Sequence, residues 1–281
     1  MSGGLRPVDD LSAGRRLAAA SYSPPTEGKI FGTCEVDATE ALRFLERRRA
    51  EGVRLSMTHL VIRTTALILR DTLPELNQTV RRGRLYQRST IDIFLSVALK
   101  RGKEISGFKI EQVDTKSLEE IAAEIKDVAI RIRRGDTTLG VVRTQQLLQS
   151  VPGPLLRPAL RLLRLLVIDF GLDLSPVVPK DPFGSLLVTE IGSYGLGVGY
   201  PALLPLSGAS CIIAIGKIEE KAVVRDGEVV VRPILPLSAT FDHRVADAYH
   251  AGLLVRSAQE ILTHPERLEE PPDAAEPTQP S

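Results

Sequence analysis

A strict alternation of apolar and other residues runs through positions 91–99. Ile91, Ile93, Leu95, Val97 and Leu99 occupy every second position, which is the period of a β-strand that buries one of its faces. The stretch 105–113 follows at once and is suited to pair with it. A chain with such a strand has to cover one face of a sheet with other elements, so an all-helical fold is excluded.

Helical and strand patterns interleave along the rest of the chain. Strands are predicted at 29–36, 186–191, 210–219 and 234–241, and the pair Asp226-Gly227 favours a tight hairpin turn. Helices are predicted up to the arginine run 47–49, over 58–73, after the capping box of Ser117 and Glu120, and over 251–262. We therefore expect one α/β domain with a mixed sheet over residues 26–268, between an arm (1–25) and a disordered polar tail (269–281).

Charge and cysteine content exclude several classes of protein. The 281 residues carry 36 Lys and Arg against 35 Asp and Glu, a net charge of +1, so we expect no nucleic-acid partner. Cys34 and Cys211 lie far apart in the sequence and form neither a disulfide framework nor a metal-binding motif. The first ten residues lack the apolar run of an export signal, and a cytoplasmic location is the expectation.

One histidine has a context that suits catalysis. His243 follows a predicted strand and precedes a predicted helix, with Asp242 and Arg244 beside it and Asp247 four residues later. A histidine titrates near neutral pH and can take a proton from a thiol or a hydroxyl. A salt-bridged strand end would produce the same short pattern. The other histidines are His59 and His264, which helix positions explain, and His250, for which we identify no acidic partner at close spacing.

A glycine-rich run follows the strand predicted at 186–191. Glycines occupy positions 192, 195, 197 and 199, but no helix and no Gly-Lys-Ser/Thr follows them. A phosphate-binding loop is therefore not indicated. We expect a tightly turned loop instead.

Several motifs together resemble a known family. Residues 241–248, Phe-Asp-His-Arg-Val-Ala-Asp-Ala, resemble the Asp-His-Arg-x-x-Asp-Gly signature of the catalytic domain of 2-oxoacid dehydrogenase E2 acyltransferases, which are relatives of chloramphenicol acetyltransferase. Residues 73–77, 116–122, 184–195 and 209–218 resemble further segments of that domain, in the same order. The resemblance extends over roughly residues 5–268. It implies a chloramphenicol acetyltransferase-like two-layer sandwich with a mixed sheet.

The resemblance also implies an activity. The family's catalytic domains form trimers in which coenzyme A and a lipoyl arm enter a channel between subunits from opposite ends. His243 matches the histidine that deprotonates the thiol, and Thr189 occupies the position of the serine that stabilises the oxyanion. Coenzyme A is then a co-substrate, and no metal is expected.

Five more residues are implied at the site, Asp247 as a catalytic residue and four others in support. Asp247 matches the second polar position of the signature, and we expect it to pair with Arg15 or Arg16 from the N-terminal arm. Asp242 and Arg244 flank the base and are expected to hold it in place.

The sequence departs from the family pattern at three places. Ala248 replaces the glycine of the signature, Thr189 adds a methyl group to the donor, and the strand 104–110 lacks the usual proline and contains Lys109. We therefore keep two alternatives beside acyl transfer from a thiol carrier to coenzyme A. One is a catalytically weak trimeric scaffold that binds partners, and the other is an acetyltransferase for a small hydroxylated acceptor.

Residues 141–182 form a stretch that is far longer than the family's usual link. Within it, 154–168 reads as an amphipathic helix with Arg157, Arg161 and Arg164 along one side. The helix is too short and too charged to span a bilayer. It could contact a membrane surface, bind a partner, or pack as part of a helical hairpin on its own trimer.

Assembly follows from the resemblance and from the ends of the chain. No lipoyl domain precedes the catalytic region, so we expect a stand-alone protein whose lipoyl group is supplied by another chain. The tail after position 268 has no bulky apolar residue to insert into a neighbouring trimer. A discrete homotrimer is the expectation.

Overall fold

A mixed β-sheet forms the centre of the structure. The computed structural model describes residues 28–99, 104–134, 151–175, 178–205 and 207–269. The seven-stranded sheet has the order β1-β9-β7-β6-β4-β5, with β8 paired to β9. Its strands are β1 (Lys29–Asp37), β4 (Ile93–Leu99), β5 (Glu104–Ile110), β6 (Leu186–Glu190), β7 (Cys211–Ile215), β8 (Glu219–Arg225) and β9 (Glu228–Asp242). The β4–β6 and β6–β7 pairs are parallel and the other pairs are antiparallel.

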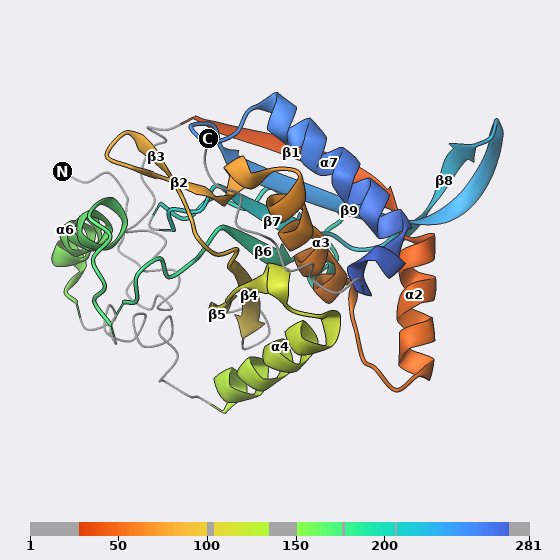
Figure 1. The fold of residues 1–281 in the computed structure, drawn as a ribbon, viewed down its shortest axis with the longest axis horizontal. Helices are drawn as coiled ribbons and strands as arrows, with labels where there is room; N and C mark the ends of the chain where they lie inside the picture. The colour runs from red at the N-terminus through yellow and green to blue at the C-terminus, as the bar shows by residue number, and fades with distance from the viewer. Residues whose placement is uncertain (1–27, 100–103, 135–150, 176–177, 206, 270–281) are drawn as a thin grey trace, which may run out of the picture.

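Helices cover one face of this sheet (Figure 1). They are α2 (Thr39–Ala50), α3 (Met57–Asp71), α4 (Leu118–Arg133) and α7 (Ala248–Thr263). Alternate strand residues such as Val188, Ile213 and Phe241 enter one apolar core together with helix residues such as Leu60 and Leu262. The predicted two-layer α/β architecture with a mixed sheet is confirmed.

The opposite face of the sheet is covered differently. Phe94, Leu187 and Ile212 point away from the helices and pack with Leu203 and Ala209 from the segment after the glycine-rich run. This second cluster is much smaller than the main core. By strand register, the same side of β1 and β9 carries Phe31, whose ring contacts that of Tyr200, and polar side chains such as Thr33 and Ser238.

Strand β9 is longer than the sequence indicated. A hairpin arm and a separate strand at 234–241 were expected, but β9 continues from Glu228 to Asp242 through Pro233 and Pro236. Proline weakens a strand prediction because it has no N–H to donate. Here both prolines serve as acceptors: the carbonyl of Pro233 accepts from the N–H of Ala38, and that of Pro236 from the N–H of Gly216.

The strand expected at 210–219 is shorter than predicted, and the first arm of the expected hairpin is β8. β7 ends at Ile215 and β8 begins at Glu219. At Gly216, between them, a Cβ atom would lie 1.8 Å from the carbonyl oxygen of Gly197, so only glycine allows this approach of the glycine-rich loop. That loop is tightly turned, as expected: it starts with a 3₁₀ turn, η5 (Gly192–Tyr194), and Gly195 has a φ of 81°.

A second hairpin was not anticipated. After a 3₁₀ turn, η1 (Pro74–Asn77), the chain forms β2 (Gln78–Arg81) and β3 (Arg84–Gln87), which pair only with each other within the described residues. The turn residues Arg82 and Gly83 both have positive φ. An arginine in this conformation gives no turn signal at the sequence level.

The stretch between α4 and β6 contains the predicted amphipathic helix. Helix α6 (Gly153–Arg164) continues into a π-helical turn, η4 (Leu165–Asp169). Val167 and Ile168 form a small cluster with Val178, and η4 contacts β2. Residues 135–150, where the other half of a helical hairpin would have to lie, are outside the described residues. Among the helices that the structure describes, none has the length and apolar character needed to cross a membrane.

Candidate active site

His243 lies on a tight turn at the end of β9. The backbone N–H groups of Val245 and Ala246 both donate to the carbonyl oxygen of Asp242, at 2.9 and 3.0 Å. The N–H of His243 donates to the carbonyl oxygen of Gly28, which precedes β1 (3.1 Å). The turn is therefore fastened to the sheet, while the His243 side chain is exposed.

A hydrogen bond selects the tautomer of His243. Its Nδ1 lies 2.8 Å from the carbonyl oxygen of Ala246. Because a carbonyl oxygen can only accept, Nδ1 carries the proton of the neutral ring. Nε2 is then the unprotonated nitrogen, and it can act as a base toward a thiol or a hydroxyl.

Asp242 and Arg244 form an ion pair under the turn. The guanidinium Nε of Arg244 lies 2.9 Å from Asp242 Oδ1, and the backbone N–H of Arg244 donates to the same oxygen at 3.0 Å. Asp242 is buried. Burial disfavours the carboxylate, but the hydrogen bonds from Arg244 outweigh it and hold the pKa of Asp242 below its ordinary value. The pair fixes the residues on both sides of His243.

Asp247 caps helix α7. Its carboxylate accepts from the backbone N–H groups of Tyr249 and His250, and the His250 ring Nδ1 lies 2.7 Å from Oδ1. These hydrogen bonds, that from the His250 ring first, lower the pKa of Asp247. The expectation that His250 has no close acidic partner is therefore wrong. Arg15 and Arg16, the expected partners of Asp247, lie outside the described residues.

Thr189 lies on the face of the sheet that the helices do not cover. It is half-buried, near the end of β6. On the same strand, Leu186 and Val188 enter the main core. Leu187, which lies between them, belongs to the cluster on the opposite face. Because side chains alternate along a strand, Thr189 shares the side of Leu187.

Within one chain, Thr189 and His243 are far apart. Strand register places Thr189 in one row with Ala214 and Ser238, and Ser238 precedes His243 by five residues. At the usual strand dimensions the separation is about 16 Å along the strands and about 10 Å across them. The two side chains cannot contact one carbonyl group in a single subunit.

A line of polar side chains connects these two positions. Leu237, Ala239 and Phe241 of β9 enter the main core, so Ser238, Thr240 and Asp242 face the side of Thr189. The hydroxyl of Ser238 donates to the carbonyl of Gly199 (2.6 Å). That of Thr240, which is 1% exposed, has no partner in the described part of the chain. In the sequence, the polar residues at every second position of 238–242 were the signal that could have indicated this line.

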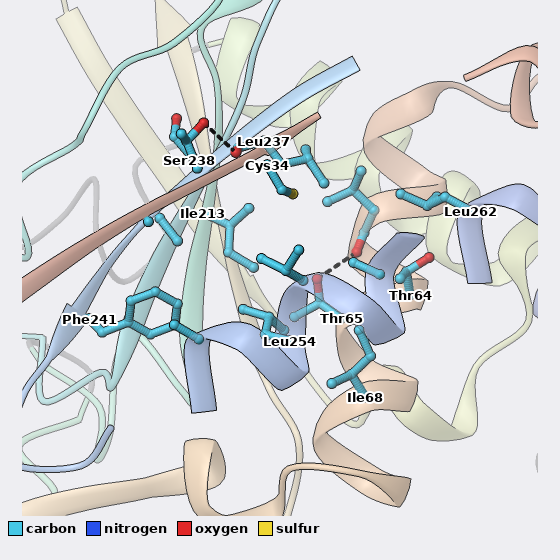
Figure 2. A pocket seen from close by; sticks show the side chains of 17 residues that line it. Cys34, Thr64, Thr65, Ile68, Ile213, Leu237, Ser238, Phe241, Leu254 and Leu262 are labelled. Carbon is cyan, nitrogen blue, oxygen red and sulfur yellow. Dashed lines mark hydrogen bonds between the residues drawn. The ribbon is translucent and has the colours of Figure 1, made fainter. Parts of the chain in front are cut away.

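A cavity of about 50 Å³ lies elsewhere, between the sheet and helices α3 and α7 (Figure 2). Apolar side chains such as Ile68, Ile213 and Leu254 line most of it. Cys34 also lines it, and burial, followed by the charge of Glu35, raises the pKa of its thiol to about 11. The cavity is too small for coenzyme A and offers no nucleophile at neutral pH, so it is not the candidate active site.

Comparison with known proteins identifies the family. The family model of the 2-oxoacid dehydrogenases acyltransferase (catalytic domain) matches residues 15–143 and 183–269, more than half of the chain. The chain belongs to this family. The resemblance seen in the motifs is thereby confirmed, and residues 144–182 are left outside the matched regions.

Individual relatives agree with this assignment. The chain is 26% identical over 240 residues to the dihydrolipoyllysine-residue acetyltransferase component of the pyruvate dehydrogenase complex of Bacillus subtilis, covering 83% of this chain and 43% of the relative. It is 23% identical over 255 residues to the corresponding Zymomonas mobilis component, covering 89% of this chain and 47% of the relative. The chain therefore spans less than half the length of these relatives.

Solved structures share the fold. A probable dihydrolipoamide acetyltransferase from Listeria monocytogenes superimposes with a TM-score of 0.64 at 20% identity, covering 89% of this chain and 88% of the other. The dihydrolipoamide acetyltransferase of Azotobacter vinelandii gives a TM-score of 0.62 at 19% identity, with 86% and 84% covered. The architecture of the acyltransferase core is thus present in this chain.

Two departures from the family pattern have structural explanations. Ala248 is the first residue of α7 and is not among the residues with positive φ, so replacing glycine there causes no backbone strain. Lys109 on β5 lies 3.1 Å from the Asp92 carboxylate. Burial opposes its charge, but Asp92 keeps the pKa of Lys109 above its ordinary value. The lysine is therefore accommodated as one partner of an ion pair.

An aromatic ring covers part of the face that carries Thr189. At Gly107 on β5, a Cβ atom would lie 2.3 Å from the Phe94 ring, so the ring covers the position that a side chain would take. Phe94 in turn packs against Phe183, with ring centroids 4.8 Å apart. In this chain, aromatic rings fill this corner of the face that carries Thr189.

Proposed function

We propose that this chain is a coenzyme A-dependent acyltransferase in which His243 is the general base. The observation that carries the proposal is the hydrogen bond from Nδ1 of His243 to the carbonyl of Ala246. It leaves Nε2 unprotonated on a turn that is fastened to the sheet, and the side chain is open to a substrate.

The reaction follows from this arrangement. Nε2 takes the proton of the attacking thiol, and the thiolate adds to the carbonyl carbon of an acyl thioester. The tetrahedral intermediate collapses, its carbon–sulfur bond to the leaving group breaks, and the imidazolium returns the proton to the departing thiolate. The acyl group moves from the thiol of a dihydrolipoyl group to coenzyme A, or in the reverse direction, without net consumption of a proton.

We propose that Thr189 of a neighbouring subunit donates a hydrogen bond to the oxyanion. The distance between Thr189 and His243 within one chain requires a second copy, and a closed homotrimer gives each subunit one such neighbour. The A. vinelandii structure was determined to study the roles of a serine, a histidine and an asparagine in catalysis, the last two four residues apart. His243 and Asp247 have the same spacing, which supports the assignment of His243 as the base.

Asp242, Arg244 and Asp247 are proposed as positioning residues. The ion pair and the cap of α7 hold both ends of the turn that carries His243. In the same proposal Arg15 or Arg16 reaches Asp247 in the assembled trimer.

The acyl donor is proposed to be a lipoyl group on a separate protein. The relatives are named as components with acetyltransferase, succinyltransferase or branched-chain lipoamide acyltransferase activity. These names agree with a thioester donor, and the acyl group differs from one relative to another. Free dihydrolipoamide can replace the carrier in an assay. Transfer only to hydroxylated acceptors would instead support an acetyltransferase of small molecules, and an intact trimer without turnover would support a scaffold.

Co-expression of two inactive variants tests the shared site. His243→Ala and Thr189→Ala should each be impaired alone. In mixed trimers, about one quarter of the sites should combine an intact His243 with an intact Thr189 from the neighbour, and activity should return to that extent. If both residues serve one chain, no mixture regains activity, and light scattering that reports a stable monomer would contradict the proposal.

A further inference from the structure

One corner of the molecule combines two segments that are rich in arginine and poor in acidic residues. Residues 78–88 contain the β2–β3 hairpin, and residues 151–172 contain α6 and η4. Together they carry seven arginines and one acidic residue, Asp169; one of the seven, Arg88, has a buried side chain paired with Asp181, which leaves six for the surface. We call these two segments the basic corner. The whole chain has a net charge of only +1, so positive charge is concentrated here.

Contacts join the two segments into one surface. The guanidinium of Arg82 lies over the ring of Phe170, 5.2 Å from its centroid. A Cβ atom at Gly171 would lie 2.4 Å from the guanidinium of Arg81, so the hairpin packs directly on the chain after η4. Figure 1 shows α6 beside the β2–β3 hairpin, at the end of the molecule away from the β8 hairpin.

The basic corner also exposes large apolar side chains. Seven of them are exposed: Leu85, Tyr86, Leu155, Leu162, Leu165, Phe170 and Leu172. Leu155 and Leu162 are more than half exposed, at 58% and 55%. Along α6 and the first residue of η4, Leu155, Leu162 and Leu165 form one stripe. Arg157, Arg161 and Arg164 form the neighbouring stripe. The inward side holds Leu156 and Leu160, which are buried.

We propose that the basic corner binds the surface of an anionic membrane. Arginine pairs with phosphate through two parallel hydrogen bonds, and leucine and phenylalanine beside it can enter the boundary between headgroups and acyl chains. The family model leaves 144–182 unmatched, so α6 is an addition to the acyltransferase core. The inference is independent of the proposed catalytic function.

The shape of the surface favours a membrane over a protein segment. The exposed leucines stand on the convex side of a helix, and the cavity described above lies between the sheet and helices α3 and α7, not at this corner. A docking peptide needs a groove for its apolar side chains, whereas a lipid surface adapts to a convex helix. The complementary charge of acidic headgroups supplies the attraction.

Vesicle binding tests the proposal with the full-length protein. We expect co-sedimentation with vesicles of phosphatidylcholine and phosphatidylglycerol, little with phosphatidylcholine alone, and weaker binding as salt is raised. Replacing Arg157, Arg161 and Arg164 by glutamine should lower the partition coefficient on the order of 100-fold. Leu155→Ser with Leu162→Ser should also weaken binding, because these exposed side chains would insert.

A matched control removes three arginines elsewhere. Arg43, Arg47 and Arg49 lie on α2, far from the basic corner (Figure 1), and their replacement by glutamine should leave vesicle binding near that of the wild type. Circular dichroism and light scattering check that each variant keeps its fold and assembly.

Four outcomes would overturn the proposal. They are no binding to anionic vesicles at low salt, an equal loss in the α2 control, unchanged binding of the leucine variant, and displacement by inorganic phosphate. The last two would indicate a site for soluble anions. Binding of a soluble acidic protein without any binding to vesicles would likewise reject the membrane in favour of a protein partner.

Discussion

The two faces of the central sheet carry different side chains from the same strands. The face toward the helices is apolar, with Leu186, Val188, Ile213, Ala239 and Phe241 in one continuous core. The other face carries Thr189, Ser238, Thr240 and Asp242 beside a small apolar cluster. A buried polar group costs free energy unless it has a partner. The first face therefore stabilises the domain, and we interpret the second as the face that carries its chemistry.

The largest effect is expected at the end of the polar face. His243→Ala should lower acyl transfer by roughly 10²- to 10⁴-fold, the usual contribution of a general base. The free energy of unfolding should change little, because the side chain is exposed. Formation of acyl-coenzyme A measures the first quantity and thermal unfolding the second.

His264→Ala is the matched control for this variant. His264 is exposed and follows α7 at its far end, so its replacement should leave turnover unchanged. Unchanged turnover in His243→Ala would remove this residue from the mechanism.

Replacing two adjacent leucines in turn compares how much each face of the sheet contributes to stability. Leu186 and Leu187 are both buried on β6, but Leu186 enters the main core and Leu187 the smaller cluster. Leu186→Ala should cost about 3–5 kcal/mol of unfolding free energy, and Leu187→Ala about 2–3 kcal/mol, because the loop over the smaller cluster can relax into the space left. Denaturant unfolding measures both, and equal costs would show that the faces are equally rigid.

Thr189 tests whether the polar face acts in catalysis. Thr189→Ala should reduce turnover by roughly 10²- to 10³-fold if the hydroxyl donates to the oxyanion, and Thr189→Ser should retain activity. Thr189→Val keeps the shape of the side chain without the hydroxyl. A valine variant as active as the wild type would rule out the donor role.

The smallest effect concerns acid stability. Because the folded-state pKa of Asp242 is lowered, the unfolded chain takes up this proton first as the pH falls below about 4. The free energy of unfolding should then decrease by at most about 1.4 kcal/mol per pH unit from this group. Asp242→Asn should show a shallower acid slope between about pH 4 and pH 2, and an unchanged slope would contradict the role of the Arg244 pair.

The sequence predicted the elements that local patterns encode. The alternation over 91–99 corresponds to β4, and Ser117 with Glu120 caps α4 as expected. The turn at Asp226-Gly227, with positive φ at both residues, joins β8 to β9. These features depend on interactions between neighbours in the chain, so their residue types are sufficient to indicate them.

Other elements depend on contacts between distant segments. Residues on both sides of Pro233 and Pro236 join one strand because β1, β7 and β8 lie alongside it. The β2–β3 hairpin turns at Arg82, where the residue type gives no signal. The domain boundaries at 25 and 268 stay predictions.

The candidate site shows the same division. From the motif alone, His243 was recognisable as a candidate base and Asp242 and Arg244 as its flanking pair. The tautomer of His243, the cap formed by Asp247 with His250, and the distance between His243 and Thr189 were not recognisable. Residue types state which chemistry is available, whereas sheet register and strand order determine which groups can meet, because they set distances between residues that lie far apart in the sequence.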